Sequence, residues 1–83
     1  MIIKYFSWIK EHGGKSEEQI ELPDHIKNVN ELINHLNEID NKYSLIFDKK
    51  ELIKIAVNKT YSSFETNISN SDEIAFIPPV TGG

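Results

Sequence analysis

The first residues of the chain alternate between two faces, which is the pattern of a β-strand. Residues 2–9 are rich in β-branched and aromatic side chains. Successive strand residues point to opposite faces, so Ile3 and Tyr5 share one face, and Lys4 and Phe6 share the other. Because a lysine is rarely buried without a partner, we expect Phe6 to lie on the exposed face.

A second alternating segment follows a glycine pair. Gly13-Gly14 interrupts the pattern and predicts a turn. Residues 18–22 then alternate again, which predicts a strand with Ile20 and Leu22 on its buried face. Pro23 ends this strand because proline cannot donate to a central ladder.

The middle of the chain changes to the helical period. Asn28 is suited to cap a helix, and Glu31 three residues later completes the pattern of a capping box. Apolar residues then recur at helical spacing, at Val29, Leu32, Ile33, Leu36 and Ile39. The spacing predicts an amphipathic helix of about three turns.

The last third of the chain predicts two more strands. Residues 43–50 are expected to form a connector, and residues 51–58 alternate as a strand with Ile53, Ile55 and Val57 inward. Residues 59–72 are polar and predict a surface loop anchored by one or both of its aromatic residues, Tyr61 and Phe64.

The final predicted strand, residues 74–77, leads into two prolines. Its alternation places Ile74 and Phe76 on one face, opposite Ala75 and Ile77. If Ile74 and Phe76 face the core, then Phe6 and Ile77 become exposed neighbours on the outer face, which Tyr61 can join from its loop. An apolar patch of this kind on a small domain usually marks an interface.

The order strand, strand, helix, strand, strand predicts the fold class. The last strand can lie beside the first in the middle of a mixed sheet, with one main helix packed on one face. This arrangement is the α+β, ubiquitin-like β-grasp, whereas the alternative ferredoxin-like sandwich needs a second helix. We expect a β-grasp domain over residues 1–77 and an extended tail over residues 78–83.

Composition narrows the function classes. The 83 residues carry 9 basic and 13 acidic side chains, for a net charge of -4, and every base is lysine. Without the arginine fork that suits phosphate, nucleic acid is not an expected partner. The longest apolar runs are far shorter than a membrane span of roughly 18 residues, and the start lacks a secretory signal, so we expect a cytoplasmic protein without membrane contact.

Candidate chemistry within the domain is sparse. There is no cysteine to act as a nucleophile or metal ligand. His12, His25 and His35 lack metal-binding spacing, so no metal site is predicted. The acidic pairs Glu17-Glu18 and Asp72-Glu73 are interpreted as solvated charges rather than as general acid and base. We therefore expect no active site inside the domain.

The C-terminal tail is the candidate functional segment. No charged side chain follows Glu73, and the chain ends in Pro78-Pro79-Val80-Thr81-Gly82-Gly83. Two prolines favour an extended stalk, and six residues at ~3.3 Å each reach roughly 20 Å. The bare backbone of Gly82 and Gly83 can enter a narrow channel and present the terminal carboxylate to a reactive centre. A frayed terminus is the alternative, but such an end is more often charged.

The tail carries a family resemblance. The resemblance spans the chain and is most specific in the run Asp72-Glu73-Ile74-Ala75-Phe76-Ile77-Pro78-Pro79-Val80-Thr81-Gly82-Gly83. This run closely resembles the C-terminus of the small subunits of molybdopterin synthase, which are ubiquitin-like sulfur carriers. A terminal double glycine alone is shared with other carriers and modifiers, and the extension before it is more specific. Supporting matches lie at Tyr5-Phe6-Ser7-Trp8, Lys10-Glu11, Gly14-Lys15 and Val57-Asn58-Lys59.

The resemblance implies a sulfur-donor subunit that is not an enzyme by itself. A ubiquitin-activating-like adenylyltransferase would use ATP and magnesium to adenylate Gly83, and a sulfur donor system would convert it to a thiocarboxylate. Residues 78–82 would thread the tail into the partner. The large synthase subunit, in a heterotetramer, would then use the sulfur on the pyranopterin precursor. No cofactor is expected to bind this chain stably.

Two alternatives remain open from the sequence. A sulfur carrier for thiamine synthesis or tRNA thiolation would use the same carboxylate chemistry, and a ubiquitin-like protein modifier would conjugate the tail to lysines. In the favoured interpretation, Phe6, Tyr61 and Ile77 contact the large synthase subunit.

Overall fold

The computed structural model describes residues 1–6, 9–11 and 14–78. The expectations for Ser7, Trp8, His12, Gly13 and residues 79–83, including Pro79, Val80, Thr81, Gly82 and Gly83, lie outside this part. The strands are β1 (Ile2–Tyr5), β2 (Glu17–Gln19), β3 (Lys54–Val57), β4 (Thr60–Ser62) and β5 (Glu73–Ile77). The main helix is α2 (Val29–Ile39), and the short helical turns are η1 (Asn41–Tyr43), α3 (Ser44–Phe47) and η2 (Lys50–Leu52).

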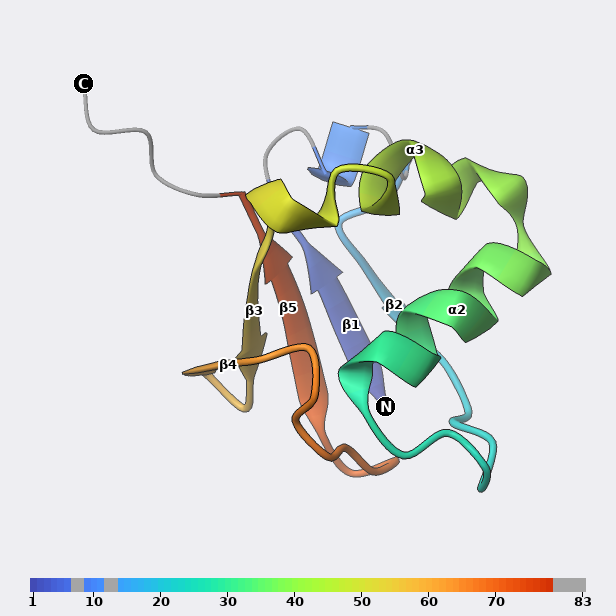
Figure 1. Ribbon diagram of the computed structural model, residues 1–83, viewed down its shortest axis with the longest axis vertical. Helices are drawn as coiled ribbons and strands as arrows, with labels where there is room; N and C mark the ends of the chain where they lie inside the picture. Colours follow the sequence, from blue (N-terminus) through green and yellow to red (C-terminus); the bar gives the residue numbers. More distant parts are fainter. Residues whose placement is uncertain (7–8, 12–13, 79–83) are drawn as a thin grey trace.

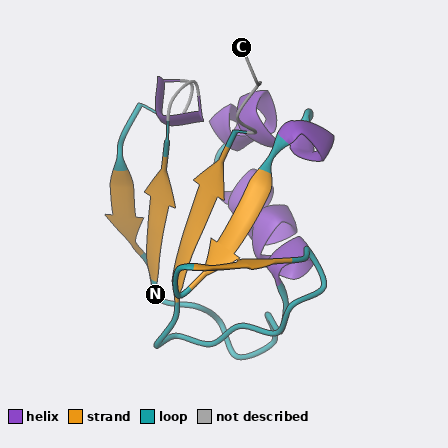
Figure 2. Ribbon diagram, turned by 90° about the vertical axis from the view of Figure 1, so that its left-hand side faces the viewer, coloured by secondary structure: helices purple, strands orange, loops and turns teal. Residues whose placement is uncertain are grey.

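The strands form one mixed sheet in the order β2-β1-β5-β3-β4 (Figure 1). β5 lies in the centre, parallel to β1 and antiparallel to β3. α2 and α3 cover one face of this sheet, while no helix of the described part covers the other (Figure 2). This topology confirms the predicted ubiquitin-like β-grasp, with the first and last strands side by side.

The main helix begins where its sequence predicts. Asn28 is the N-cap, and its side-chain oxygen accepts the Glu31 N–H at 2.9 Å. The Glu31 carboxylate accepts the N–H of Lys27 at 2.6 Å, so the capping box is displaced by one residue. The helical spacing places Ile39 on the buried face, but its side chain is 61% exposed. It lies in the last helical turn, directly before Asp40, whose extended backbone ends the helix.

The predicted second strand is shorter than expected. β2 spans Glu17–Gln19 because its ladder with β1 pairs only the residues from Ile2 to Lys4. Leu22 is buried and Ile20 packs against the core, as predicted, although both lie beyond the strand.

Two other segments are more ordered than their sequences indicate. The predicted connector, residues 43–50, contains α3 and parts of η1 and η2. The predicted loop, residues 59–72, contains β4, which pairs with β3. Each element has only three or four residues, too few for a hydrophobic period to become visible.

The rest of the loop closes the start of α2. The N–H groups of Val29 and Asn30 donate to the carbonyls of Thr66 and Phe64, at 3.2 and 2.9 Å. Phe64 is half-buried and packs against the core, which confirms it as an anchor. Tyr61 is not a core anchor, since it is 75% exposed on β4.

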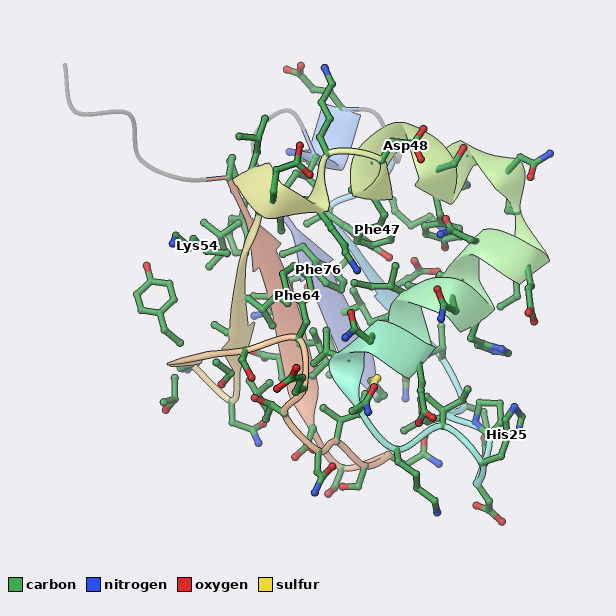
Figure 3. All side chains as sticks on the ribbon, viewed as in Figure 1. His25, Phe47, Asp48, Lys54, Phe64 and Phe76 are labelled. Carbon is green, nitrogen blue, oxygen red and sulfur yellow. The ribbon has the colours of Figure 1, made fainter. Side chains whose placement is uncertain are left out.

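The core centres on Phe76 of β5, which is fully buried. Its ring packs edge to face against Phe47 of α3, with centroids 4.9 Å apart (Figure 3). It also stacks with Tyr5 of β1, with centroids 6.0 Å apart. Phe47 in turn stacks with Tyr43 of η1 at 6.4 Å. The aromatic cluster therefore joins β1 and β5 to the helical layer.

We expect Phe76→Ala to lower the free energy of unfolding by about 3–5 kcal/mol, because it removes a buried ring and leaves a cavity. Ile77→Ala is the matched control on the same strand, since Ile77 is only half-buried on the opposite face. Chemical denaturation of both variants measures the difference. Equal losses for the two variants would contradict the inward assignment of Phe76.

Candidate partner-binding site

The outer face of the sheet carries a row of side chains across four strands. The register aligns Lys4 of β1 with Ala75 of β5, Ala75 with Ala56 of β3, and Ala56 with Tyr61 of β4. The two central residues of this row are alanines, whose side chains reach only one carbon above the sheet. The row therefore dips at its centre.

The dip is an open hollow of about 290 Å³, which we call the outer hollow. It is lined by Lys4, Phe6, Ala56, Lys59, Tyr61, Glu73, Ala75 and Ile77. Ala56 and Ala75 form its floor and are only 6% and 8% exposed, although no described helix covers this face. Longer neighbours shield them, so the hollow follows from small residues beside large ones.

The three predicted interface residues meet in the outer hollow. Phe6 is exposed, as predicted, and Ile77 is half-buried on the same face. Tyr61 joins them from β4 rather than from a loop. Their shared face is confirmed, whereas their contact with a partner stays a prediction.

A second hollow adjoins the first at the end of β5. It has a volume of about 770 Å³ and shares Tyr61 and Ile77 with the outer hollow. Phe64 and Pro78 also line it. Pro78 is the one residue of the predicted tail within the described part, and it lies in the lining of the second hollow.

The end of the outer hollow farther from Pro78 is held by Asn58. Its side-chain amide donates to Asp72 at 2.8 Å, and its side-chain oxygen accepts the N–H of Glu73 at 3.0 Å. Asp72 also accepts the N–H of Ser69, at 2.8 Å. The sequence marks Asn58 only through the family resemblance, and it carries no signal that this side chain joins the β3–β4 turn to β5.

The acidic pair Asp72-Glu73 is therefore structural rather than simply solvated. Besides the bonds of Asp72, Glu73 forms an ion pair with Lys4 at 3.4 Å across β5 and β1. Both Glu73 and Lys4 are half-buried.

In the other acidic pair, Glu17-Glu18, the prediction of two solvated charges is wrong for Glu18. It points inward from β2 and accepts hydrogen bonds from the hydroxyls of Tyr5 at 2.5 Å and Tyr43 at 2.6 Å. Lys15 also donates to it, at 3.2 Å. The inward phase of β2 continues from Ile20 and Leu22 back to Glu18, a signal present in the alternation.

These hydrogen bonds determine the protonation states of Glu18, Tyr5 and Tyr43. Burial alone would raise the pKa of Glu18, but the hydrogen bonds from Tyr43, Tyr5 and Lys15 outweigh it, so the pKa lies below its usual value. Burial, followed by the bond to Glu18, raises the pKa of Tyr5 and of Tyr43. Glu18 is thus held charged between two neutral tyrosines on the inner side of the sheet. One of them, Tyr5, is the last residue of β1 and directly precedes Phe6.

The histidines do not form a metal site in the described part of the chain. His25 and His35 line a shallow hollow of about 190 Å³ with Glu31 and Glu38. Within residues 1–6, 9–11 and 14–78, no three His, Cys, Asp or Glu side chains are grouped to hold a metal ion. His12 lies outside these ranges. A helix long and apolar enough to cross a membrane is also not found among them.

Comparisons with known proteins bear on this arrangement. The model of the ThiS family matches residues 3–83. The molybdopterin synthase sulfur carrier subunit of Haemophilus influenzae is 39% identical over 64 residues, which cover 77% of this chain and 78% of that protein. Its name confirms the resemblance drawn from the tail, and agrees with a carrier subunit rather than an enzyme.

Two solved structures share the fold. SAMP1, a small archaeal modifier protein of Haloferax volcanii, superposes with a TM-score of 0.79 at 22% identity, covering 100% of this chain and 98% of that one. Molybdopterin-converting factor of Helicobacter pylori, solved as a complex of subunits 1 and 2, gives a TM-score of 0.63 at 20% identity, covering 99% and 96%. At these identities the likeness concerns the fold alone.

We expect Glu18→Gln to lower the free energy of unfolding at pH 7 by about 1–3 kcal/mol, because it removes the charge that two buried hydroxyls bond. The folded-state pKa of Glu18 is lowered, so its contribution is complete above the unfolded pKa and is lost as pH falls through the folded pKa. The difference from the unsubstituted protein should therefore shrink in acid.

Denaturation at a series of pH values measures this dependence. Glu17→Gln is the matched control, because Glu17 is the exposed neighbour of Glu18 on β2. A constant difference for Glu18→Gln from neutral pH to acid would show that its charge does not stabilise the fold.

Proposed function

The chain belongs to the ThiS family, and we propose that within this family it is the sulfur carrier subunit of a molybdopterin synthase. Two findings support the proposal. The family match extends to residue 83 and so includes the terminal glycines, and the relative from H. influenzae bears that name. The alternatives, another sulfur-transfer pathway or a protein modifier, would use the same tail.

The chemistry would take place at the carboxylate of Gly83. A carboxylate is a poor acyl donor, so a ubiquitin-activating-like adenylyltransferase would use ATP and magnesium to form the acyl adenylate, releasing pyrophosphate. A sulfur donor at the oxidation level of sulfide would then displace AMP and leave a thiocarboxylate. This nucleophile needs no cysteine, which suits a chain that has none.

The large synthase subunit would receive the loaded tail in a heterotetramer. There the thiocarboxylate sulfur would attack a carbon of the pyranopterin precursor and displace an oxygen substituent. Water would then cleave the resulting thioester, which would leave the sulfur on the pterin and regenerate the Gly83 carboxylate. The pterin-binding side chains would belong to the partner. This division of labour fits a carrier whose inward carboxylate, Glu18, is hydrogen-bonded by tyrosines and whose outer face is hollowed over β5, the last strand. We place the assembly in the cytoplasm.

The intact mass of the protein purified from its native host tests the proposal. A thiocarboxylate raises the mass by the difference between one sulfur and one oxygen atom. A protein modifier would instead be recovered joined to other proteins through an amide bond. Recovery of the unmodified mass from cells that are actively synthesising molybdopterin would contradict the proposal.

Gly83 is expected to be the reactive residue. Deleting it, or adding one residue after it, should abolish sulfur loading while leaving the fold intact, since Gly83 comes six residues after the end of β5 at Ile77. Loading is measured by mass after incubation with the activating enzyme, ATP and the sulfur donor, and folding by circular dichroism. Adenylation of the truncated protein at the normal rate would refute this assignment.

The outer hollow is expected to contact the large subunit. Phe6→Ala and Ile77→Lys should each bind it at least about tenfold more weakly, a loss of roughly 1.4 kcal/mol. Ala75→Leu should have the same effect by filling the floor of the hollow without entering the core.

Isothermal titration calorimetry with the large subunit measures these affinities. Ile39→Ala is the matched control, because Ile39 is an exposed apolar residue on the helical layer. Unchanged affinity for all three outer-face variants would show that the partner docks elsewhere.

A further inference from the structure

Lys59, one of the charged residues that line the outer hollow, has a backbone conformation that is unfavourable for a residue with a side chain. Asn58 and Lys59 form the two-residue turn between β3 and β4, and both have positive φ, 51° and 69°. Such a turn prefers asparagine followed by glycine, because a side chain in this region of φ is strained. Lysine at the second position is therefore costly to the fold.

The strain at Asn58 is offset, whereas the strain at Lys59 has no visible compensation. Asn58 exchanges side-chain hydrogen bonds with Asp72 and Glu73. Among the described residues, Lys59 forms no ion pair, side-chain hydrogen bond or cation–π contact. Strained residues retained without structural benefit tend to serve function.

The charge of Lys59 gives the hollow its polarity. The charged residues that line the outer hollow are Lys4, Lys59 and Glu73, and Lys4 and Glu73 neutralise each other at 3.4 Å. The remaining positive charge belongs to Lys59, within a chain whose net charge is -4. Phe6 and Ile77 provide the apolar side of the same hollow.

We propose that Lys59 is a specificity-determining residue of the outer hollow and that the partner places an aspartate or glutamate side chain against its ammonium group. This proposal rests on the proposed function, in which the partner is the large synthase subunit. The partner segment seats an apolar side chain over Ala56 and Ala75, beside Phe6 and Ile77, and its carboxylate lies at the β3–β4 turn. The local positive charge orients this carboxylate, which the acidic remainder of the chain repels.

Binding titrations with the large subunit test the proposal. Lys59→Glu should weaken binding about tenfold or more at low salt, and Lys59→Gln should weaken it less, because it removes attraction without adding repulsion. Raising the salt from about 50 to 500 mM should reduce the difference between these variants, since salt screens an exposed pair. Lys27→Glu is the control of equal charge change, because Lys27 is exposed in the loop before α2.

Lys59→Gly separates a binding role from a structural one. Glycine relieves the positive φ, so this variant should have a higher melting temperature than the unsubstituted protein and still bind the large subunit more weakly. A merely structural lysine would not produce gain of stability together with loss of affinity.

The outcomes distinguish the two proposals. If Phe6→Ala weakens binding while Lys59→Glu and Lys59→Gly bind normally, the role of Lys59 is refuted and the proposed function stands. If the unsubstituted carrier does not bind the large subunit, both are refuted. Weakening by Lys27→Glu equal to that by Lys59→Glu would also refute the role of Lys59, because it would reduce the effect to net charge.

Discussion

The fold depends on the contact between the inward carboxylate of Glu18 and the hydroxyls of Tyr5 and Tyr43. An inward carboxylate without partners would be strongly unfavourable, and two buried hydroxyls would lose hydrogen bonds to water. Placed together, they satisfy one another and connect β2, β1 and η1. The Tyr5 ring then stacks on Phe76, so the same contact supports the central strand β5.

This arrangement explains why the two faces of β5 can serve different purposes. Phe76 is locked into the aromatic cluster beneath the helical layer, and this fixes the strand without help from the outer face. Ala75 and Ile77 lie on the outer face and are not part of the core cluster. Small residues at the centre of the sheet leave a hollow there, and Ile77 leads directly to Pro78 and the predicted tail.

The β3–β4 turn holds one residue that stabilises the fold, Asn58, and one that is proposed to bind the partner, Lys59. Asn58 uses its side chain to join this turn to the start of β5, which supports its positive φ. The next residue has the same sign of φ without a comparable bond within the described structure. A position that glycine would occupy with less strain thus carries a charge at the rim of the outer hollow, where it can act on a partner.

The sequence by itself determined the β-grasp order, the cap and buried stripe of α2, and the opposite faces of Phe76 and Ile77, because hydrophobic periodicity reports directly on burial. It also singled out the C-terminal glycines. Tertiary structure alone decided the short elements, since three or four residues are too few to show a hydrophobic period. The alternation already placed Glu18 on the inward face, but only the tertiary structure supplied the two tyrosine hydroxyls that make an inward carboxylate stable. The hollow over Ala56 and Ala75 likewise required the register, which brings residues 19 positions apart into contact.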